Sequence, residues 1–290
     1  MKSSLTICAI RAEKTAIAFW LFPKWGGVEF EAVHNLTTVD APETIRYVKS
    51  QKDVRIDKPE KTMWQLIVDK RMPPTRLVRY CCAELKERGG QRRTKITGVR
   101  WEESVSRKNN AGFVKIIGRE KTIRKEAEEL GLDYLVTPKA GLVLNDDNDD
   151  NRLFVEHCYR TSSVMVNPIV DWTEKDVWEF LHHYGIKSNP LYEVEEINGT
   201  YKPCGKSRIG CIGCPMQNGK RQKQELAKYP KYRDAYLRAF TRMQEKRAED
   251  SLPPFGFDVY GSMNAEQIMM WWVGDDPRQM SLFGTPEYLK

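Results

Sequence analysis

Five of the seven cysteines lie in two short segments of the chain, and this grouping is the strongest constraint that the sequence places on the fold. Cys81 and Cys82 are adjacent, whereas Cys204, Cys211 and Cys214 lie within the run CGKSRIGCIGCP. Thiolates so close in sequence are redox partners or ligands for a thiophilic metal. The spacing C-x6-C-x2-C followed by a proline is typical of an iron–sulfur ligand run, with one more thiolate supplied from a distant segment. A tetrahedral zinc site is the main alternative, because C-x2-C suits Zn²⁺ as well.

Length and composition describe an ordinary globular protein. The 290 residues suffice for one large or two modest domains, and 40% of them are apolar and 30% charged. No apolar run is long enough to span a membrane, and the first residues lack a signal-peptide pattern. We therefore expect a cytoplasmic protein without membrane contact, in which thiols stay reduced. The odd cysteine count also argues against the disulfides of a secreted fold.

The net charge of +7 allows two interpretations. One is a surface that is merely well solvated. The other is an anionic partner, either a nucleotide or a nucleic acid. The charge alone does not separate them.

Short apolar runs alternate with helical patterns in the first half of the chain, which predicts an α/β fold with a parallel sheet flanked by helices. The expected strands are residues 5–10, 29–33, 54–56 and 94–99. The expected helices are residues 41–50, with Asp40 as N-cap, and residues 120–130. The acidic run at residues 145–151 is predicted to be a solvated loop.

After Asn167 the pattern becomes helical. Thr173 is the expected N-cap of a helix that Gly185 ends, with Asp176 in the capping-box position. Residues 228–248 form a second amphipathic pattern with an aromatic stripe. We expect an α/β domain over residues 1–166, a helical, cysteine-rich C-terminal part over residues 167–274 that completes the same fold, and a tail over residues 275–290.

Six motifs in order along the chain resemble the phosphoadenosine-phosphosulfate (PAPS) reductase family, within the adenine-nucleotide alpha-hydrolase-like superfamily. They are TTVDAPET (37–44), MPPTRLVRYCC (72–82), GVRWEES (98–104), PIVDWTEKDVWEFL (168–181), NPLY (189–192) and GCIGCP (210–215). The resemblance implies a Rossmann-like parallel sheet with a nucleotide lying across the strand ends, as in other open sheets.

The resemblance also implies site residues. Arg100 and Glu103 are expected in the nucleotide or sulfate pocket, where an arginine after a strand can clamp an oxyanion with two hydrogen bonds. The alternative is a surface ion pair between the two. Asp40 and Arg79 are assigned to the same pocket. Three cations, Arg76, Arg79 and Lys86, bracket the vicinal cysteines and could bind an anionic substrate, offset the charge of a thiolate-bound cluster, or be simple surface charge.

In many members of the family, a vicinal cysteine pair and a C-x2-C together hold a four-iron cluster. By that pattern Cys81, Cys82, Cys211 and Cys214 are the ligands of a [4Fe–4S] cluster, with zinc as the alternative metal. Cys204 is a fifth candidate for four positions.

Two departures from the family pattern affect function. The glycine-rich phosphate loop of the family is replaced by RAEKTA at residues 11–16, where Lys14 falls at the position of the loop lysine. No cysteine follows Cys214, although assimilatory reductases of the family use a C-terminal cysteine as nucleophile. The catalytic residue is therefore unassigned.

The first functional hypothesis is an iron–sulfur oxidoreductase or transferase of sulfur metabolism that acts on an adenylated or sulfated nucleotide. Its expected partners are an adenine sulfonucleotide or ATP-like nucleotide and an electron donor such as thioredoxin. The second is a sulfur-transfer enzyme similar to DNA-phosphorothioation proteins, and the third is a non-catalytic relative. The run QMSLF, from Gln279 to Phe283, resembles the peptide by which bacterial proteins dock on the sliding clamp, which would favour DNA-linked work.

Overall fold

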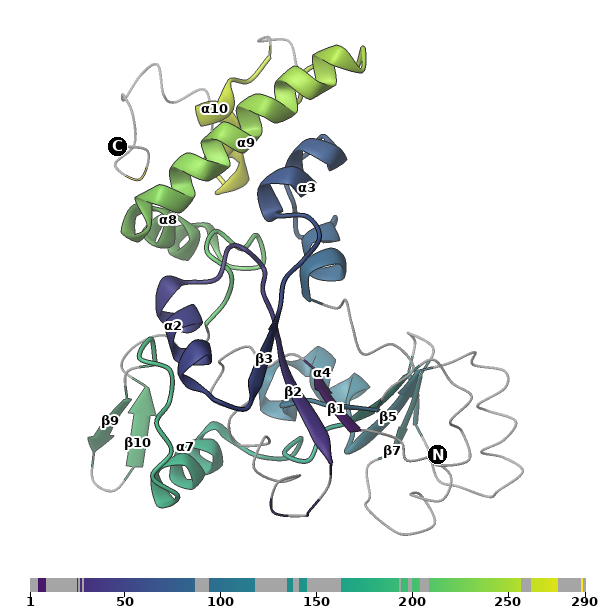
Figure 1. Ribbon diagram of the computed structural model, residues 1–290, viewed down its shortest axis with the longest axis vertical. Helices are drawn as coiled ribbons and strands as arrows, with labels where there is room; N and C mark the ends of the chain where they lie inside the picture. Colours follow the sequence, from purple (N-terminus) through teal and green to yellow (C-terminus); the bar gives the residue numbers. More distant parts are fainter. Residues whose placement is uncertain are drawn as a thin grey trace. The chain divides into compact units, whose positions relative to one another are not determined.

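The computed structural model describes residues 5–8, 25, 27, 29–86, 94–117, 135–137, 141–144, 163–192, 194–197, 200–203, 209–256, 262–275 and 288 (Figure 1). Several positions singled out above lie outside these residues. They are Lys14, Cys204, the expected helix at 120–130, the acidic run at 145–151 and the QMSLF peptide.

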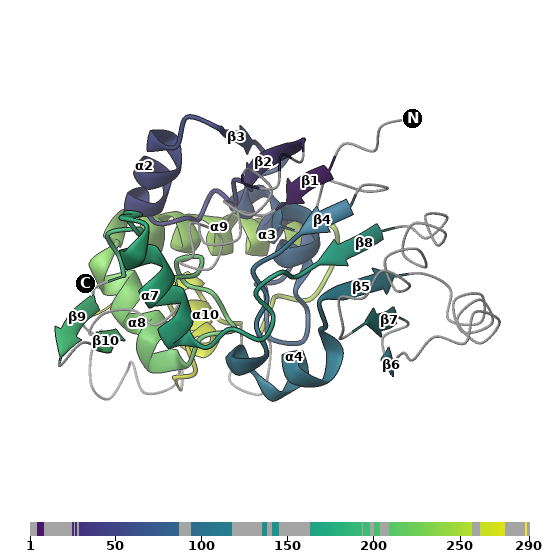
Figure 2. The same ribbon diagram turned by 90° about the horizontal axis from the view of Figure 1, so that it is seen from below.

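The described strands form one eight-stranded sheet and one two-stranded sheet (Figure 2). The large sheet has the order β3-β2-β1-β4-β8-β5-β7-β6. Its strands are β1 (Leu5–Cys8), β2 (Phe30–Asn35), β3 (Val54–Asp57), β4 (Thr94–Ile96), β5 (Val114–Ile117), β6 (Leu135–Thr137), β7 (Gly141–Leu144) and β8 (Ser163–Val166). The small sheet pairs β9 (Val194–Ile197) with β10 (Thr200–Pro203) in antiparallel register.

The first five strands of the large sheet are parallel, and the other three join in antiparallel fashion. Each of the four predicted strands is present, with its end shifted by one to three residues. The parallel sheet confirms the α/β class that the alternating pattern predicted.

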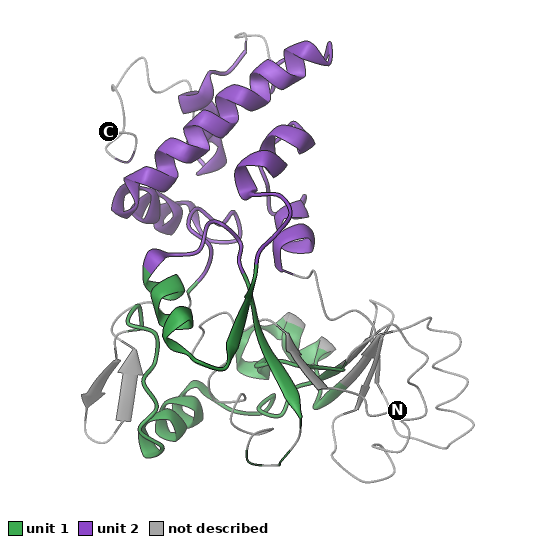
Figure 3. Ribbon diagram, viewed as in Figure 1, with its two compact units in different colours: residues 1–35, 43–57, 88–209 green, residues 36–42, 58–87, 210–290 purple. Residues whose placement is uncertain are grey.

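The chain divides into two compact units, each assembled from separate segments (Figure 3). Unit 1 comprises residues 1–35, 43–57 and 88–209, and unit 2 comprises residues 36–42, 58–87 and 210–290. The predicted domain boundaries at residues 166 and 274 divide the chain differently from these two units, and they stay predictions.

Unit 1 contains both sheets and three helices among its described residues. The helices are α2 (Pro42–Ser50, whose first residue is in unit 2), α4 (Val105–Asn110) and α7 (Glu174–His183), with a 3-10 turn, η2, at Trp101–Glu103. The capping box predicted for α7 is present, because Thr173 Oγ1 accepts from the backbone of Asp176, whose carboxylate accepts from the Thr173 backbone N–H.

The NPLY motif has a structural role in unit 1. Asn189 is fully buried, and its side-chain amide donates to Thr44 Oγ1 at 3.2 Å while its carbonyl oxygen accepts from Leu191 N at 3.0 Å. Tyr47 donates its hydroxyl to the carbonyl of Lys187 at 2.8 Å. These bonds tie α2 to the segment after α7, and they satisfy polar groups that burial would otherwise leave at a cost.

Unit 2 is helical in the described residues. Its helices are α3 (Met63–Lys70), α8 (Gly219–Lys228), α9 (Pro230–Glu249) and α10 (Ala265–Trp272), with a π-helical turn, η1, at Cys82–Lys86. The aromatic stripe predicted at 228–248 lies in α9, whose buried face includes Tyr236 and Phe240. The predicted start at Lys228 is wrong, because α8 ends there and α9 begins at Pro230, whose fixed φ suits a first helical position.

No helix in the described ranges is long and apolar enough to cross a membrane.

Candidate functional site

Four of the five candidate thiols lie in one hydrophobic cluster of unit 2. Cys81 and Cys211 are buried in this cluster, and Cys82 and Cys214 are half-buried and pack against it. None of the four is in a disulfide. We call these four residues the thiol group; it joins two sequence segments that the cysteine spacing alone could not connect.

The backbone around the vicinal pair is a π-helical turn. Cys82 N and Ala83 N both donate to the carbonyl of Arg79, at 3.0 and 3.4 Å. Single π turns are rare and are frequently found at functional sites. Cys81 hydrogen-bonds with Cys82, so the two adjacent thiols lie together.

The C-x2-C segment forms a tight turn against the aromatic core. Cys214 N donates to the carbonyl of Cys211 at 3.2 Å, and Gly213 has φ +69°. A Cβ at Gly213 would lie 3.0 Å from Trp272 Cη2 and 3.1 Å from Tyr236 Cε2. Glycine is therefore required here both by backbone conformation and by lack of space.

Two motifs of the sequence meet at this turn. Cys211 Sγ donates to Thr37 Oγ1 at 3.4 Å, and Ile212 N donates to the carbonyl of Val39 at 2.8 Å. The TTVDAPET segment thus contacts the GCIGCP segment directly. Asp40 strengthens this segment, since its carboxylate accepts from Thr37 N at 2.7 Å.

Arg76 is a further residue next to the thiol group, and the sequence had indicated it only as one of three cations that bracket the vicinal cysteines. Its Nε donates to the carbonyl of Pro215 at 3.1 Å, and its Nη2 donates to the carbonyl of Gln217 at 3.0 Å. Arg76 therefore ties the segment before the vicinal cysteines to the segment after the C-x2-C. Its position five residues before Cys81 was a weak signal, shared with the exposed Arg79.

Burial controls the electrostatics of the thiol group. The pKa of Cys81 is raised, first by its hydrogen bond with Cys82, then by burial, and further by Cys82 and Cys211, while Lys86 opposes the shift. The pKa of Tyr236 is raised by burial and then by the neighbouring Cys211, Cys81 and Cys214. A buried group of thiols favours its neutral form unless a cation compensates the charge.

The four sulfur donors of the thiol group are of the type that a thiophilic metal group uses, although their placement in this structure does not form a metal site. Four reduced thiols surrounded by aliphatic and aromatic side chains are the ligands that iron–sulfur clusters and structural zinc use. Among the described residues, no three or more His, Cys, Asp or Glu side chains are placed as a group that could hold a metal ion.

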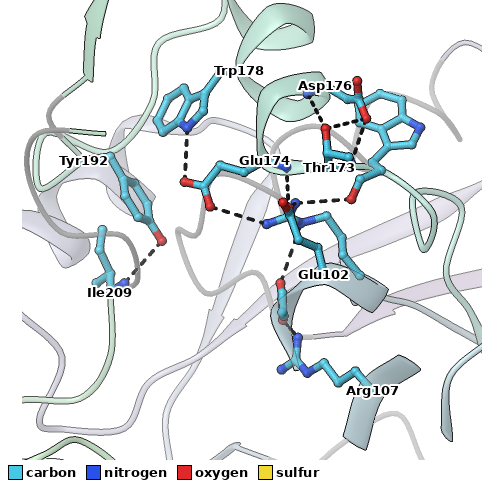
Figure 4. A network of polar contacts seen from close by, with 11 residues as sticks. Glu102, Arg107, Thr173, Glu174, Asp176, Trp178, Tyr192 and Ile209 are labelled. Carbon is cyan, nitrogen blue, oxygen red and sulfur yellow. Dashed lines mark hydrogen bonds and ion pairs between the residues drawn. The ribbon is translucent and has the colours of Figure 1, made fainter. Parts of the chain in front are cut away.

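Arg100 of the GVRWEES motif lies in unit 1, within a polar network whose members Glu102, Glu174 and Arg107 are labelled in Figure 4. It is 3% exposed, and its Nη1 donates to Glu102 Oε2 at 2.9 Å and to the carbonyl of Trp172 at 3.2 Å. Nη2 lies 4.0 Å from Glu174, and Nε lies 3.8 Å from Glu103. The guanidinium is therefore surrounded by three carboxylates of its own chain.

This network also orders the start of α7. Glu102 accepts from the backbone N–H of Glu174, the first residue of that helix. A carboxylate at a helix N-terminus is stabilised by the unpaired N–H groups and the helix dipole. Glu103 contacts Arg107 of α4 as well. The expected pair of Arg100 and Glu103 is thus part of a larger buried network, and its role in anion binding stays a prediction.

Asp40 and Arg79, which were predicted for the same site, belong to unit 2, whereas Arg100 belongs to unit 1. Asp40 is buried, and its backbone carbonyl accepts from Tyr232 Oη at 2.9 Å. Both its backbone carbonyl and its carboxylate therefore have hydrogen-bond partners. Its carboxylate faces Thr37 N rather than capping α2. Arg79 is exposed in unit 2.

Comparison with known proteins adds to this geometry. Residues 13–217 match the phosphoadenosine phosphosulfate reductase domain. The chain is 30% identical over 67 residues to an adenosine 5'-phosphosulfate reductase of Bacillus cytotoxicus, which is 23% of this chain and 24% of that protein. It is 30% identical over 66 residues to the reductase of Bacillus thuringiensis, with the same shares. The chain thus matches about a quarter of the length of these curated relatives. Because the domain match covers most of the sequence, the chain belongs to the phosphoadenosine phosphosulfate reductase domain family.

Proposed function

We propose that this protein is an iron–sulfur enzyme of sulfur metabolism that acts on an adenylated or sulfated nucleotide. The observation that carries the proposal is the grouping of Cys81, Cys82, Cys211 and Cys214 in one buried cluster of unit 2. Family membership supports the nucleotide substrate, and an electron-donor protein such as thioredoxin would supply reducing equivalents.

The four cysteines of the thiol group are the proposed ligands of a [4Fe–4S] cluster. When bound, the cluster would supply a polarising, redox-active centre. Thr37 would direct its hydroxyl at the sulfur of Cys211, and Tyr236 and Trp272 would keep water from the C-x2-C turn. Hydrogen bonds to ligand sulfurs and exclusion of solvent are the levers by which a protein sets the properties of such a centre.

The nucleotide or sulfate contact is proposed for Arg100. Its Nη2 edge is held least tightly, because Glu174 lies 4.0 Å away whereas Nη1 makes two shorter contacts. An entering oxyanion would compete with Glu174 for this edge, and the buried surroundings would strengthen the resulting charge-assisted bond.

The first experiment is anaerobic purification with iron, sulfide and zinc assays and a visible spectrum. We expect about four irons and four sulfides per chain with broad visible absorption. Cys211→Ser and Cys214→Ser are expected to lose most of the iron, while Cys158→Ser, a cysteine outside both groups, retains it. Cys204→Ser shows whether the fifth thiol replaces one of the four.

Two outcomes contradict the cluster. Stoichiometric zinc without visible absorption assigns the thiols to a structural metal site. Equal iron in Cys158→Ser and Cys211→Ser separates the iron from the thiol group altogether.

The nucleotide part is tested by equilibrium binding of adenosine 5'-phosphosulfate to the full-length protein. Arg100→Lys, which keeps the charge but loses the planar fork, is expected to weaken binding at least tenfold. Glu174→Gln, which removes the competing carboxylate, is expected to strengthen it. Unchanged binding in both variants assigns the nucleotide contact elsewhere.

A further inference from the structure

Nearly all of the net charge of this protein is carried by two consecutive helices of unit 2. Residues 219–249, which form α8 and α9, contain ten lysines and arginines and four aspartates and glutamates. Their net charge is +6, against +7 for the whole chain. The anionic partner that a basic protein implies should therefore be sought at these helices.

Three cations of α9 form a row on one face of the helix. Lys231, Arg238 and Arg242 are separated by seven and four residues, so they fall within about 20° of one line and extend over roughly 16 Å. All three are exposed. Within the described part of the chain, none has a hydrogen bond or an ion pair with the protein.

Other cations of the same helix are used within the fold. Lys246 pairs with Glu249 and Asp250, and Arg247 donates to the carbonyls of Pro253 and Arg71. The row thus differs from its neighbours in having no partner of its own. One exposed carboxylate, Glu245, lies beyond the end of the row at Arg242.

A groove runs beside this row where α3 packs against α9. Its volume is about 490 Å³, and both Arg238 and Arg242 line it. On the opposite wall lie Trp64 and Gln65 of α3, together with Asp69, whose carboxylate pairs with Lys61 at 2.7 Å. Trp64 is half-buried and packs edge-on against Tyr236, with 4.7 Å between ring centroids, which fixes the orientation of the indole.

We propose that the row and the groove bind a single-stranded nucleic acid, with backbone phosphates on Lys231, Arg238 and Arg242 and a base in the groove against Trp64. A fixed aromatic wall beside unpaired cations is the combination that single strands use, since bases stack and phosphates pair. The row is longer than one mononucleotide, because roughly 16 Å is several times the ~3.4 Å axial spacing of phosphates along one strand.

A membrane surface fits this site less well than a nucleic acid does. The wall of the groove contributed by α3 presents an amide and a carboxylate beside the indole, whereas interfacial helices bury a broad apolar face. The proposal is independent of the metal and of the nucleotide contact at Arg100. The iron assay and the oligonucleotide binding experiment can therefore each contradict one proposal without contradicting the other.

The test uses the full-length protein and a fluorescein-labelled 12-residue oligothymidylate, with anisotropy measured between 50 and 300 mM salt. The logarithm of the association constant falls linearly with the logarithm of the salt concentration. For a single strand, each lost phosphate contact makes this slope shallower by about 0.7. The double variant Arg238→Gln/Arg242→Gln is therefore expected to make the slope shallower by about 1.4 and to weaken binding at least tenfold at the lowest salt. Lys49→Gln/Lys52→Gln, which removes the same charge from exposed positions of unit 1, is expected to leave both values nearly unchanged.

The base contact has its own arm. Trp64→Leu is expected to weaken binding of the oligonucleotide several-fold without changing the salt slope, and Trp64→Phe to restore part of it. A thermal melt of each variant checks that it is folded. If the arginine and lysine double variants lose the same affinity for the oligonucleotide, the binding depends only on net charge, and the proposal is overturned. Binding to phosphatidylserine vesicles but not to the oligonucleotide, with the same dependence on Arg238 and Arg242, would overturn it in favour of a membrane.

Discussion

Cys211 donates its thiol to the hydroxyl of Thr37 across 174 residues of sequence, at a sulfur–oxygen distance of 3.4 Å. Thr37 Oγ1 also accepts from Val39 N, so one hydroxyl holds a loop and contacts a proposed metal ligand. Its side chain is 2% exposed, and water cannot replace it.

Replacing Thr37 should therefore lower stability. Thr37→Val keeps the shape but leaves the Val39 amide and the Cys211 thiol without an acceptor, and we expect a loss of about 1–2 kcal/mol in urea unfolding. Thr37→Ser retains the hydroxyl and should lose less. A valine variant as stable as the wild type would show that the hydroxyl of Thr37 does not contribute to stability.

The turn at Gly213 predicts a difference between two glycines. Gly213 and Gly185 both have positive φ, but a Cβ would meet Trp272 and Tyr236 at Gly213 and open space at Gly185. Gly185→Ala should cost about 1–2 kcal/mol from backbone strain alone. Gly213→Ala should cost about 1–3 kcal/mol more from overpacking. If both variants lose the same free energy of unfolding in denaturant, the aromatic core accommodates the added methyl group without a loss of stability.

The carboxylates around Arg100 make its removal costly. Arg100→Met should lower the free energy of unfolding by about 3 kcal/mol, because Glu103 and Glu174 lose their buried counter-charge. The value lies at the low end of the range for buried pairs, since Glu102 is half-exposed. Urea unfolding at neutral pH measures it. Adding Glu102→Gln should recover part of the loss, and a double variant no better than Arg100→Met would show that these charges do not interact.

Tyr47 predicts a loss of stability at alkaline pH. Burial raises its pKa from 10.0 to about 12 in the folded protein. The folded state keeps the proton more tightly than the unfolded chain, so this contribution is complete below pH 10 and is lost as the pH rises to about 12. Other buried tyrosines add to the decline. The difference between wild type and Tyr47→Phe isolates this one, at most about 2 kcal/mol, and parallel stability curves from pH 9 to 12 would contradict the assignment.

Local signals in the sequence were sufficient for several elements of the fold, among them four strands of the large sheet and the helix α7. Thr173 and Asp176 form the predicted capping box, and strands at the predicted positions pair in parallel, because both depend on neighbouring residues. The break between α8 and α9 carried a local signal too, the proline at position 230, but the continuous aromatic stripe outweighed it.

The site was less predictable, because its contacts join distant segments. The resemblance of motifs, rather than their spacing, linked Cys81 to Cys211. No periodicity shows that Arg76 reaches the carbonyls of Pro215 and Gln217, or that Glu174 closes around Arg100. Backbone carbonyls carry no signature in the sequence, and a carboxylate partner can lie anywhere in the chain.

The division of unit 2 among three segments has a consequence for biosynthesis. The ribosome makes Cys82 well before Cys211, and at about 5–20 residues per second the intervening chain takes roughly 6–26 seconds to synthesise. During that interval unit 2 lacks α8, α9 and α10, which supply half of the buried residues described for its core. Cys81 and Cys82 are therefore exposed during that interval, because the helices that later cover them have not yet been made.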